Sequence, residues 1–167
     1  MGIITKMKQM VAMKYYPWRI RKKAAKCGNG LYCGGKSWVT NNTYLGKHVN
    51  FNGMGISGNG KVEIGDYFHS GVGCQIITSF HNYEGNKIPY DEHFLDKDVY
   101  IGDCVWFGNN VIVLGGVKIG EGAIIQAGSV VCKDIPAFGI AGGHPATVFK
   151  YRDKEHYLKL KERGNFH

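Results

Sequence analysis

The chain has 167 residues, of which 44% are hydrophobic and 20% charged, a composition sufficient for one domain with its own core. No apolar run is long enough to cross a bilayer, and the first 26 residues lack the unbroken apolar stretch of a signal peptide. The five cysteines are odd in number and form no C-x-x-C pair, so they imply neither a disulfide framework nor that type of metal site. We therefore expect a single cytoplasmic domain.

The positive charge is concentrated at the N-terminus. Residues 1–26 hold eight Lys or Arg and no acidic residue, whereas the other 13 basic residues balance all 13 acidic ones, so the whole net charge of +8 lies in this segment. Its apolar residues recur at helical spacing, and Pro17-Trp18 is expected to end the helix or to begin a connector. The apolar positions are Ile3, Ile4, Met7, Met10 and Val11.

Two roles for this basic helical segment, residues 1–26, remain open. A basic amphipathic helix with Tyr and Trp at its end can lie on an anionic leaflet, which would place the protein at the inner face of the membrane. It can equally pack against the rest of the domain or against a neighbouring subunit. Nucleic acid is not an expected partner, because no helix-turn-helix, zinc or single-strand-binding motif accompanies the charge.

The second half of the chain carries a repeat of six residues, with small or branched residues four positions behind each apolar one. The first column is Ile101, Phe107, Val113, Ile119, Ile125 and Val131, and the second is Val105, Val111, Val117, Ala123, Ser129 and Ile135. A period of six fits neither one helix nor one strand, and it is typical of a parallel β-helix in which short strands stack into coils. We predict this all-β fold, built of hexapeptide repeats, over residues 35–148.

The repeat extends upstream and is then interrupted. The upstream positions are Val39, Leu45, Phe51, Ile64, Ser70 and Ile76 in the first column, and Phe68, Cys74 and Phe80 in the later part of the second. One extra residue lies near Ser57–Gly60, where a bulge or turn is expected. A polar run containing Pro89 breaks the phase and predicts a loop over residues 81–98. Because insertions in a repeat array often form its binding face, we expect the active site there.

A turn and a helix are expected after the last repeat. Gly142–Ala146 reads as a turn, and the charged segment that follows predicts a C-terminal helix over residues 149–163. This helix would cover the open end of the stack, because a solenoid must cap its exposed terminus.

Several blocks of the sequence resemble the hexapeptide-repeat acyltransferases. They are Ile101–Gly108, Gly116–Gly120, Ala127–Pro136 and Gly142–Ala146. Within that superfamily, residues 35–155 are similar to the galactoside and maltose O-acetyltransferases and to enzymes that acetylate bacterial surface polysaccharides. The resemblance implies a left-handed parallel β-helix, an exception to the usual right-handed crossover. It also implies a homotrimer that binds acetyl-CoA in grooves between neighbouring subunits.

The same resemblance implies residues for the acceptor side of the site. His81, where the repeat breaks, matches the catalytic histidine of the family, and Asn50 matches its acceptor-binding asparagine. The further candidates for binding a sugar or glycan acceptor are Asn52, Tyr83, Glu84 and Asp91. Alternatively, the asparagines could be corner residues of the coils and the loop residues could hold the loop in place. Glu84 could orient His81 or the sugar.

The resemblance also implies residues that contact acetyl-CoA. Trp106 matches the tryptophan of the family, and the backbone of Gly108, Ala127 and Gly128 would line the pantetheine groove. Candidates for the outer part of the cofactor are Lys133, Lys150 and Arg152. Two departures from the family pattern are Cys132, where threonine is usual, and Gly55–Gly58, where an aspartate is usual. The second departure leaves the identity of the acceptor sugar open.

These residues suit acetyl transfer from a thioester to a sugar hydroxyl, as in surface polysaccharide biosynthesis. The hydroxyl must lose its proton as it attacks, and an unperturbed imidazole, with a pKa of about 6.5, can accept that proton. Neither a covalent acyl-enzyme nor a metal is required. His69 and His93 flank His81, but they do not form the close pairs of zinc ligands.

Two other functions remain open at this point. One is the detoxifying acetylation of a small hydroxylated compound. The other is a non-catalytic β-helix that scaffolds a glycan-assembly complex.

Overall fold

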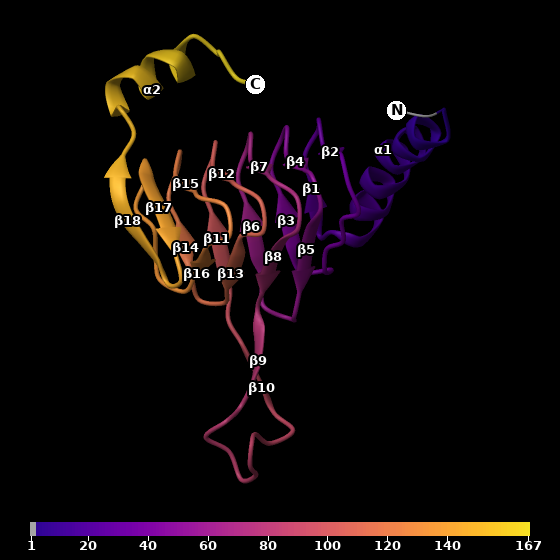
Figure 1. Ribbon diagram of the computed structural model, residues 1–167. Helices are drawn as coiled ribbons and strands as arrows, with labels where there is room; N and C mark the ends of the chain where they lie inside the picture. Colours follow the sequence, from indigo (N-terminus) through magenta and orange to yellow (C-terminus); the bar gives the residue numbers. More distant parts are fainter. Residues whose placement is uncertain (1–2) are drawn as a thin grey trace.

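The computed structural model describes residues 3–167, with side chains described from Met13 onward. It is a mostly β structure in which a parallel solenoid of about six turns lies between two helices (Figure 1). The predicted left-handed parallel β-helix of hexapeptide repeats is confirmed. No helix in this part of the chain is both long and apolar enough to cross a membrane.

Three sheets form the sides of the solenoid. Sheet 1 contains β1 (Lys26–Cys27), β3 (Thr43–Leu45), β6 (Val62–Ile64), β11 (Val99–Ile101) and β14 (Lys118–Ile119). Sheet 2 contains β2 (Tyr32–Cys33), β4 (Asn50–Phe51), β7 (His69–Ser70), β12 (Trp106–Phe107), β15 (Ile124–Ile125), β17 (Gly139–Gly143) and β18 (Ala146–Tyr151). Sheet 3 contains β5 (Met54–Ser57), β8 (Cys74–Ile77), β13 (Ile112–Leu114) and β16 (Val130–Val131).

The chain visits sheets 1, 2 and 3 in turn, so each coil adds one strand to each side. Ile101 pairs with Ile119, and Phe107 pairs with Ile125, in parallel register. Partners in successive coils are thus three hexapeptides apart. Successive members of a column therefore lie on the three sheets in turn, and every third member stacks on its equivalent in the next coil.

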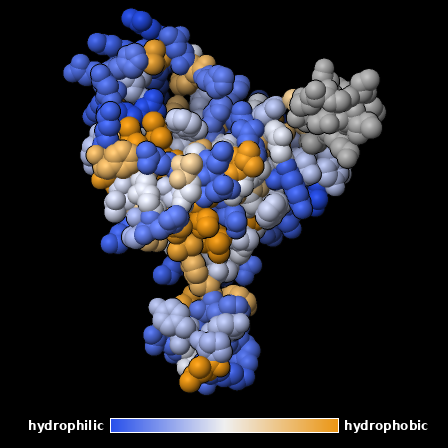
Figure 2. Space-filling model, viewed as in Figure 1, coloured by the Kyte–Doolittle hydropathy of each residue, from blue (hydrophilic) through white to orange (hydrophobic). Residues whose placement is uncertain are grey.

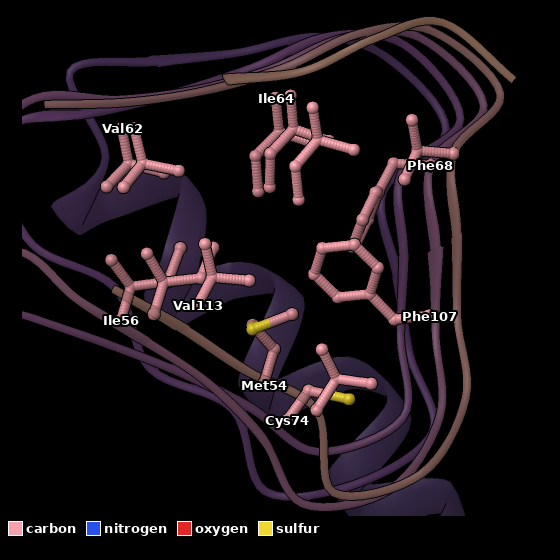
Figure 3. Packing of buried hydrophobic residues seen from close by; sticks show 14 of the residues in the cluster. Met54, Ile56, Val62, Ile64, Phe68, Cys74, Phe107 and Val113 are labelled. Atoms are coloured by element: carbon pink, nitrogen blue, oxygen red, sulfur yellow. The ribbon is translucent and has the colours of Figure 1, made fainter. Parts of the chain in front are cut away.

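Both predicted columns point inward and form the core. From Ile101 onward, every residue of the two columns is at most 4% exposed. Phe68 packs edge-on against Phe107, with ring centroids 5.0 Å apart (Figure 3). It packs in the same way against Phe51 at 6.0 Å, so an aromatic ladder links three coils. Phe80 is the exception, because it lies outside the coils in a hairpin and is only half-buried.

The extra residue expected near Ser57–Gly60 lies at the corner between sheets 3 and 1. Gly58 has a φ of 96° there, a conformation that favours glycine. The side chain of Thr78 donates a hydrogen bond to the carbonyl of Ser57 at 2.9 Å and so joins this corner to the next coil. The longer turn is therefore absorbed without loss of register.

The N-terminal helix α1 runs from Ile3 to Lys23 and contains Pro17, so the expectation that Pro17-Trp18 ends the helix was wrong. The helix continues because Ile20, only 1% exposed, packs with Tyr16 into the core at the first coil. The free energy gained by burying this last turn exceeds the free energy lost because Pro17 cannot donate a backbone hydrogen bond. The predicted apolar face from Ile3 to Val11 lies outside the described side chains.

The C-terminal region differs in detail from the prediction. Residues 146–151 form β18, which pairs with β17 in an antiparallel hairpin, so the predicted turn tightens around His144 and Pro145. Helix α2 begins at Lys154, later than predicted, because the side chain of Asp153 caps it by accepting a hydrogen bond from the His156 amide at 2.9 Å. It ends at Glu162.

The interruption of the repeat is an antiparallel hairpin formed by β9 (Ser79–His81) and β10 (Phe94–Asp96). It leaves the solenoid after β8 of sheet 3 and returns before β11 of sheet 1. At its base, the Lys97 amide donates a hydrogen bond to the Thr78 carbonyl at 2.8 Å. The excursion therefore begins two residues before the predicted loop. Figure 1 shows it projecting from the side of the solenoid opposite α2.

Candidate functional site

His81 lies at the end of β9 and is exposed, with its ring enclosed by two aromatic neighbours. The centroid of the Tyr90 ring is 3.8 Å from that of the imidazole, at an interplanar angle of 17°, and the Phe94 ring lies 4.4 Å away. Tyr90 comes from the loop and Phe94 from the opposite strand, directly across from His81. The two rings restrict the orientation of the imidazole, as a group that moves a proton requires.

The loop beyond His81 is held by Asp91. This carboxylate is 6% exposed and accepts hydrogen bonds from the His93 amide at 2.9 Å and from the Asn82 side chain at 3.3 Å. The imidazole of His93 lies 3.2 Å from it. The hydrogen bond from the His93 backbone amide and the contact with the His93 side chain hold the pKa of Asp91 below its ordinary value. The geometry favours the second interpretation of Asp91, that it fixes the loop.

Tyr83 and Glu84 lie on the exposed part of the same loop. Tyr83 is 72% exposed, and the Glu84 amide donates to the side-chain oxygen of Asn82 at 3.3 Å. Figure 2 shows the hairpin standing clear of the solenoid on a narrow neck, with apolar residues exposed where it joins the body. The two side chains are therefore open to a ligand or to a second copy of the chain.

Asn50 and Trp106 lie on the outer face of sheet 2, with His69 between them. In register, Asn50 on β4 pairs with His69 on β7, and His69 pairs with Trp106 on β12. Trp106 is 55% exposed. The side-chain oxygen of Asn50 is buried and has no hydrogen-bond partner among the described residues. A buried acceptor of this kind favours a ligand that can donate to it.

Asn52 is engaged in holding a corner of the coils. Its side-chain nitrogen donates to the Ser70 carbonyl at 2.9 Å, and a Cβ added to Gly34 would lie 2.3 Å from its side-chain oxygen. Both polar atoms thus face the neighbouring coils. The structure favours the corner interpretation for Asn52, whereas the side-chain oxygen of Asn50 makes no such hydrogen bond.

Gly108, Ala127 and Gly128 meet at the corner between sheets 2 and 3. A Cβ on Gly108 would lie 2.5 Å from the backbone nitrogen of Ala127, so the close stacking of two coils requires glycine there. Gly128 has a φ of 72°, and a Cβ added to it would meet no atom within 4 Å. Its backbone faces open space and can be approached by a ligand.

The three basic residues predicted to contact the outer part of acetyl-CoA do not lie together in one chain. Lys133 is exposed in the turn after β16, at the corner between sheets 3 and 1, and Lys150 is exposed on β18. Arg152 is half-buried: a guanidinium nitrogen donates to the Gly122 carbonyl at 3.3 Å, and the group lies over the Tyr157 ring at 4.8 Å. Arg152 therefore has a structural role already.

His81 and the outer face of sheet 2 lie on opposite sides of the solenoid. The hairpin leaves from the corner between sheets 3 and 1, whereas Asn50 and Trp106 lie on the sheet opposite that corner (Figure 1). A single chain therefore separates the predicted base from the predicted acceptor residue. Within the side chains described, no group of three His, Cys, Asp or Glu residues is arranged to hold a metal ion.

Sequence reasoning missed a pocket of about 460 Å³ beside Trp106, between sheet 2, α2 and residues 165–167. His69 lines it, and its ring centroid is 5.4 Å from that of His167. Burial, together with the nearby charge of His167, lowers the pKa of His69. No spacing in the sequence predicts a contact between residues so far apart along the chain.

Comparison with known proteins identifies the repeat. Residues 98–133 match the family "Bacterial transferase hexapeptide (six repeats)". The chain carries the hexapeptide repeat of bacterial transferases. Galactoside O-acetyltransferase of Escherichia coli (strain K12) is 32% identical over 123 residues, which cover 71% of this chain and 60% of that protein. The Lactococcus lactis subsp. lactis (strain IL1403) galactoside O-acetyltransferase is 37% identical over 111 residues, or 62% and 53% of the two chains.

Other relatives match more closely over less of their length. A Staphylococcus aureus (strain COL) relative is 51% identical over 57 residues, which are 34% of this chain and 29% of that protein. The chain therefore spans less than two thirds of each of these three relatives. The predicted resemblance to the hexapeptide acyltransferases, and to the galactoside and maltose O-acetyltransferases among them, is confirmed.

Solved structures of hexapeptide transferases share the fold. A maltose O-acetyltransferase from Clostridium difficile 630 has a TM-score of 0.72 at 28% identity and covers 90% of this chain and 83% of its own. A galactoside acetyltransferase in complex with coenzyme A has a TM-score of 0.73 at 24% identity, with 92% and 82% covered. At that identity the second likeness supports the fold alone.

Proposed function

We propose that this protein is an acetyl-CoA-dependent O-acetyltransferase that acetylates a sugar hydroxyl with His81 as general base. One observation carries the proposal: the solenoid is interrupted once, and the hairpin that leaves it presents an exposed histidine at the position matching the family's catalytic residue. The similarity to galactoside O-acetyltransferases supports the choice of a sugar acceptor.

The proposed reaction needs one proton acceptor and a fixed geometry. The imidazole of His81 takes the hydroxyl proton as the oxygen attacks the thioester carbonyl, and the new C–O bond forms. The C–S bond then breaks, and the imidazolium returns its proton to the CoA sulfur, leaving an acetyl ester and free CoA. Tyr90 and Phe94 hold the ring, and Asn50 contacts the acceptor; backbone N–H groups at a coil corner would stabilise the oxyanion.

The separation of His81 from Asn50 leads us to propose a homotrimer in which neighbouring chains complete each site. The outer faces of sheets 2 and 3 support this, because they expose large apolar side chains. Trp106 on sheet 2 is 55% exposed, and Trp38, which bridges to Gly55 at the edge of sheet 3, is 49% exposed. Acetyl-CoA would lie in the groove between chains. Its proposed contacts remain Trp106, Gly108, Ala127, Gly128, Lys133, Lys150 and Arg152.

Helix α1 supports a proposed place at the inner face of an anionic membrane, where surface polysaccharide is assembled. Ile20 packs into the core, while Tyr15 and Trp18 are 46% and 59% exposed among basic side chains. In this part of the helix, the face with Ile20 packs against the coils, and the face with Tyr15 and Trp18 remains available to lipid headgroups. The intact protein should sediment with phosphatidylglycerol vesicles at low salt and be released at high salt; absence of binding at low salt would contradict this part of the proposal.

The activity is tested by a screen with acetyl-CoA of free, nucleotide-linked and lipid-linked sugars and of small hydroxylated compounds. Mass spectrometry should detect acceptors that gain one acetyl group, with release of an equal amount of free CoA. If no sugar gains mass but a small hydroxylated compound such as an antibiotic does, the detoxifying alternative is correct. If the full panel yields no free CoA above the buffer rate, the protein is a scaffold and the proposal is wrong.

A further inference from the structure

The pocket next to Trp106 has a wall that comes from the C-terminal end of the described chain. Its volume is about 460 Å³, within the range of sites that bind small molecules. The side chains that shape it include Tyr67, His69, Trp106, Phe166 and His167. None of these except Trp106 is implicated in the reaction by resemblance.

Helix α2 fixes the position of this wall. The Tyr157 hydroxyl donates to a carboxylate oxygen of Glu121 at 2.9 Å, and the Lys161 ammonium lies 2.6 Å from the same oxygen. Beyond the helix, the ring of Phe166 stacks on that of Tyr67 with centroids 4.0 Å apart and an interplanar angle of 12°. The tail is thus held against the outer face of sheet 2.

The polar side chain on the sheet 2 side of the pocket is His69, and Asn50 next to it lies outside the lining. His69 lies between Asn50 and Trp106 on adjacent strands. Its lowered pKa favours a neutral imidazole, which has one donor and one acceptor nitrogen. A sugar hydroxyl can therefore both donate to and accept from His69.

We propose that this pocket binds the sugar ring of the acceptor, and that Phe166 and His167 determine the specificity of the enzyme for that sugar. Tyr67, Trp106 and Phe166 offer apolar surfaces to the C–H faces of the ring, while His69 pairs with its hydroxyl groups. This inference rests on the proposed acetyl transfer to a sugar, and it assigns the specificity of that site to the C-terminal tail.

The charges around the pocket favour an uncharged ring over a phosphate group. The Lys161 ammonium is paired with Glu121, and Arg152 donates to the Gly122 carbonyl and lies over the Tyr157 ring. Both cations of the pocket are therefore engaged in holding α2. Apart from the imidazole of His167, most of the remaining lining is aromatic or apolar, including Tyr67, Trp106 and Phe166.

Steady-state kinetics of the full chain test the proposal, with acetyl-CoA and the sugar that gains an acetyl group fastest in the screen. Phe166→Ala should raise the KM for that sugar about 3- to 10-fold, the scale of one lost aromatic contact, and leave the KM for acetyl-CoA unchanged. Leu158→Ala is the matched control, because Leu158 is 39% exposed on α2 and does not line the pocket. It should change neither constant. An unchanged sugar KM in Phe166→Ala, or an equal rise in both constants, would overturn the proposal.

A second measurement covers a Phe166→Ala protein that fails to fold and separates this inference from the proposed function. Methyl β-galactoside is titrated into the wild-type protein while the imidazole proton signals of His69 and His167 are followed by NMR, with His69→Gln used for assignment. Saturable shifts of both signals support the pocket, and their absence contradicts it. If no sugar is acetylated in the screen, the proposed function fails, but this titration still decides whether the pocket binds a sugar.

Discussion

The stacked coils and the β9–β10 hairpin differ in how deeply their residues are buried and in the contacts that hold them. In the coils, each inward residue is fixed by its partners above and below, and the repeat columns from Ile101 onward are at most 4% exposed. In the hairpin, Tyr83 is 72% and Ile88 is 99% exposed, and the loop is held by polar contacts of Asp91 and by aromatic stacking on His81. The comparison separates two parts of the molecule: the periodic part forms the buried core, and the break in the period presents His81, the proposed general base.

The sharpest way to test this division is to remove His81. In His81→Ala, turnover should fall by roughly 10²–10⁴-fold, the usual share of a general base, while the melting temperature remains unchanged. The matched control is His156→Ala, an exposed histidine on α2 whose side chain is outside the proposed site. Turnover close to wild type in a folded His81→Ala protein would remove the hairpin from the mechanism.

The converse change is made in the coils. Phe107 is fully buried and packs against Phe68, so Phe107→Ala should lower the free energy of unfolding by about 3–5 kcal/mol. Urea denaturation followed by circular dichroism measures this loss. The account would be weakened by a loss below about 1 kcal/mol, because a core that tolerates such a cavity is not tightly stacked.

A smaller effect is expected for Tyr90, whose ring stacks on that of His81. Tyr90→Ala should lower kcat about 10-fold with little change in stability, because the imidazole loses the ring that orients it. Tyr90→Phe keeps that ring and should restore most of the rate. A loss of the same size in Tyr90→Phe would indicate that the hydroxyl, and not the stacking, matters.

The smallest effect concerns the anchor of α2. Burial tends to raise the pKa of Glu121, but the Lys161 and Tyr157 hydrogen bonds outweigh it and lower the pKa. The contribution of the anchor is therefore complete above the ordinary pKa of glutamate and is lost as pH falls through the lowered value. Because the pair is about one third exposed, Glu121→Gln should cost no more than about 1 kcal/mol.

Amide hydrogen exchange along α2 measures this anchor. Exchange should quicken in wild-type protein as pH falls below about 4.3, after correction for the intrinsic rate, and Glu121→Gln should show no such additional change. Equal protection in both proteins across the whole range would show that other contacts hold the helix.

The sequence was sufficient to predict what depends on local periodicity. The two columns, the place of the interruption and the C-terminal helix follow from residue spacing, because every coil repeats the same environment. The hexapeptide blocks also led to His81, Asn50 and Trp106, which the structure places on exposed or outward-facing positions.

What the sequence could not predict depends on contacts between distant residues. Pro17 was expected to end α1, but burial of Ile20 against the first coil keeps the helix going to Lys23. The stacking of Tyr90 on His81 depends on how the loop folds back, and the pocket wall at Phe166 depends on the anchor between α2 and Glu121. No repeat encodes such contacts, so they emerge only in three dimensions.

Subunit complementation is the most direct test of the central claim, that the hairpin of one copy works on a substrate held by the coils of another. His81→Ala and Asn50→Ala proteins, each inactive alone, are denatured together, refolded as mixed trimers and assayed for acetyl transfer to the sugar. Random mixing should restore about a quarter of wild-type activity, because that share of the sites receives an intact His81 from one chain and an intact Asn50 from its neighbour. A mixture no more active than the two parents would contradict the claim.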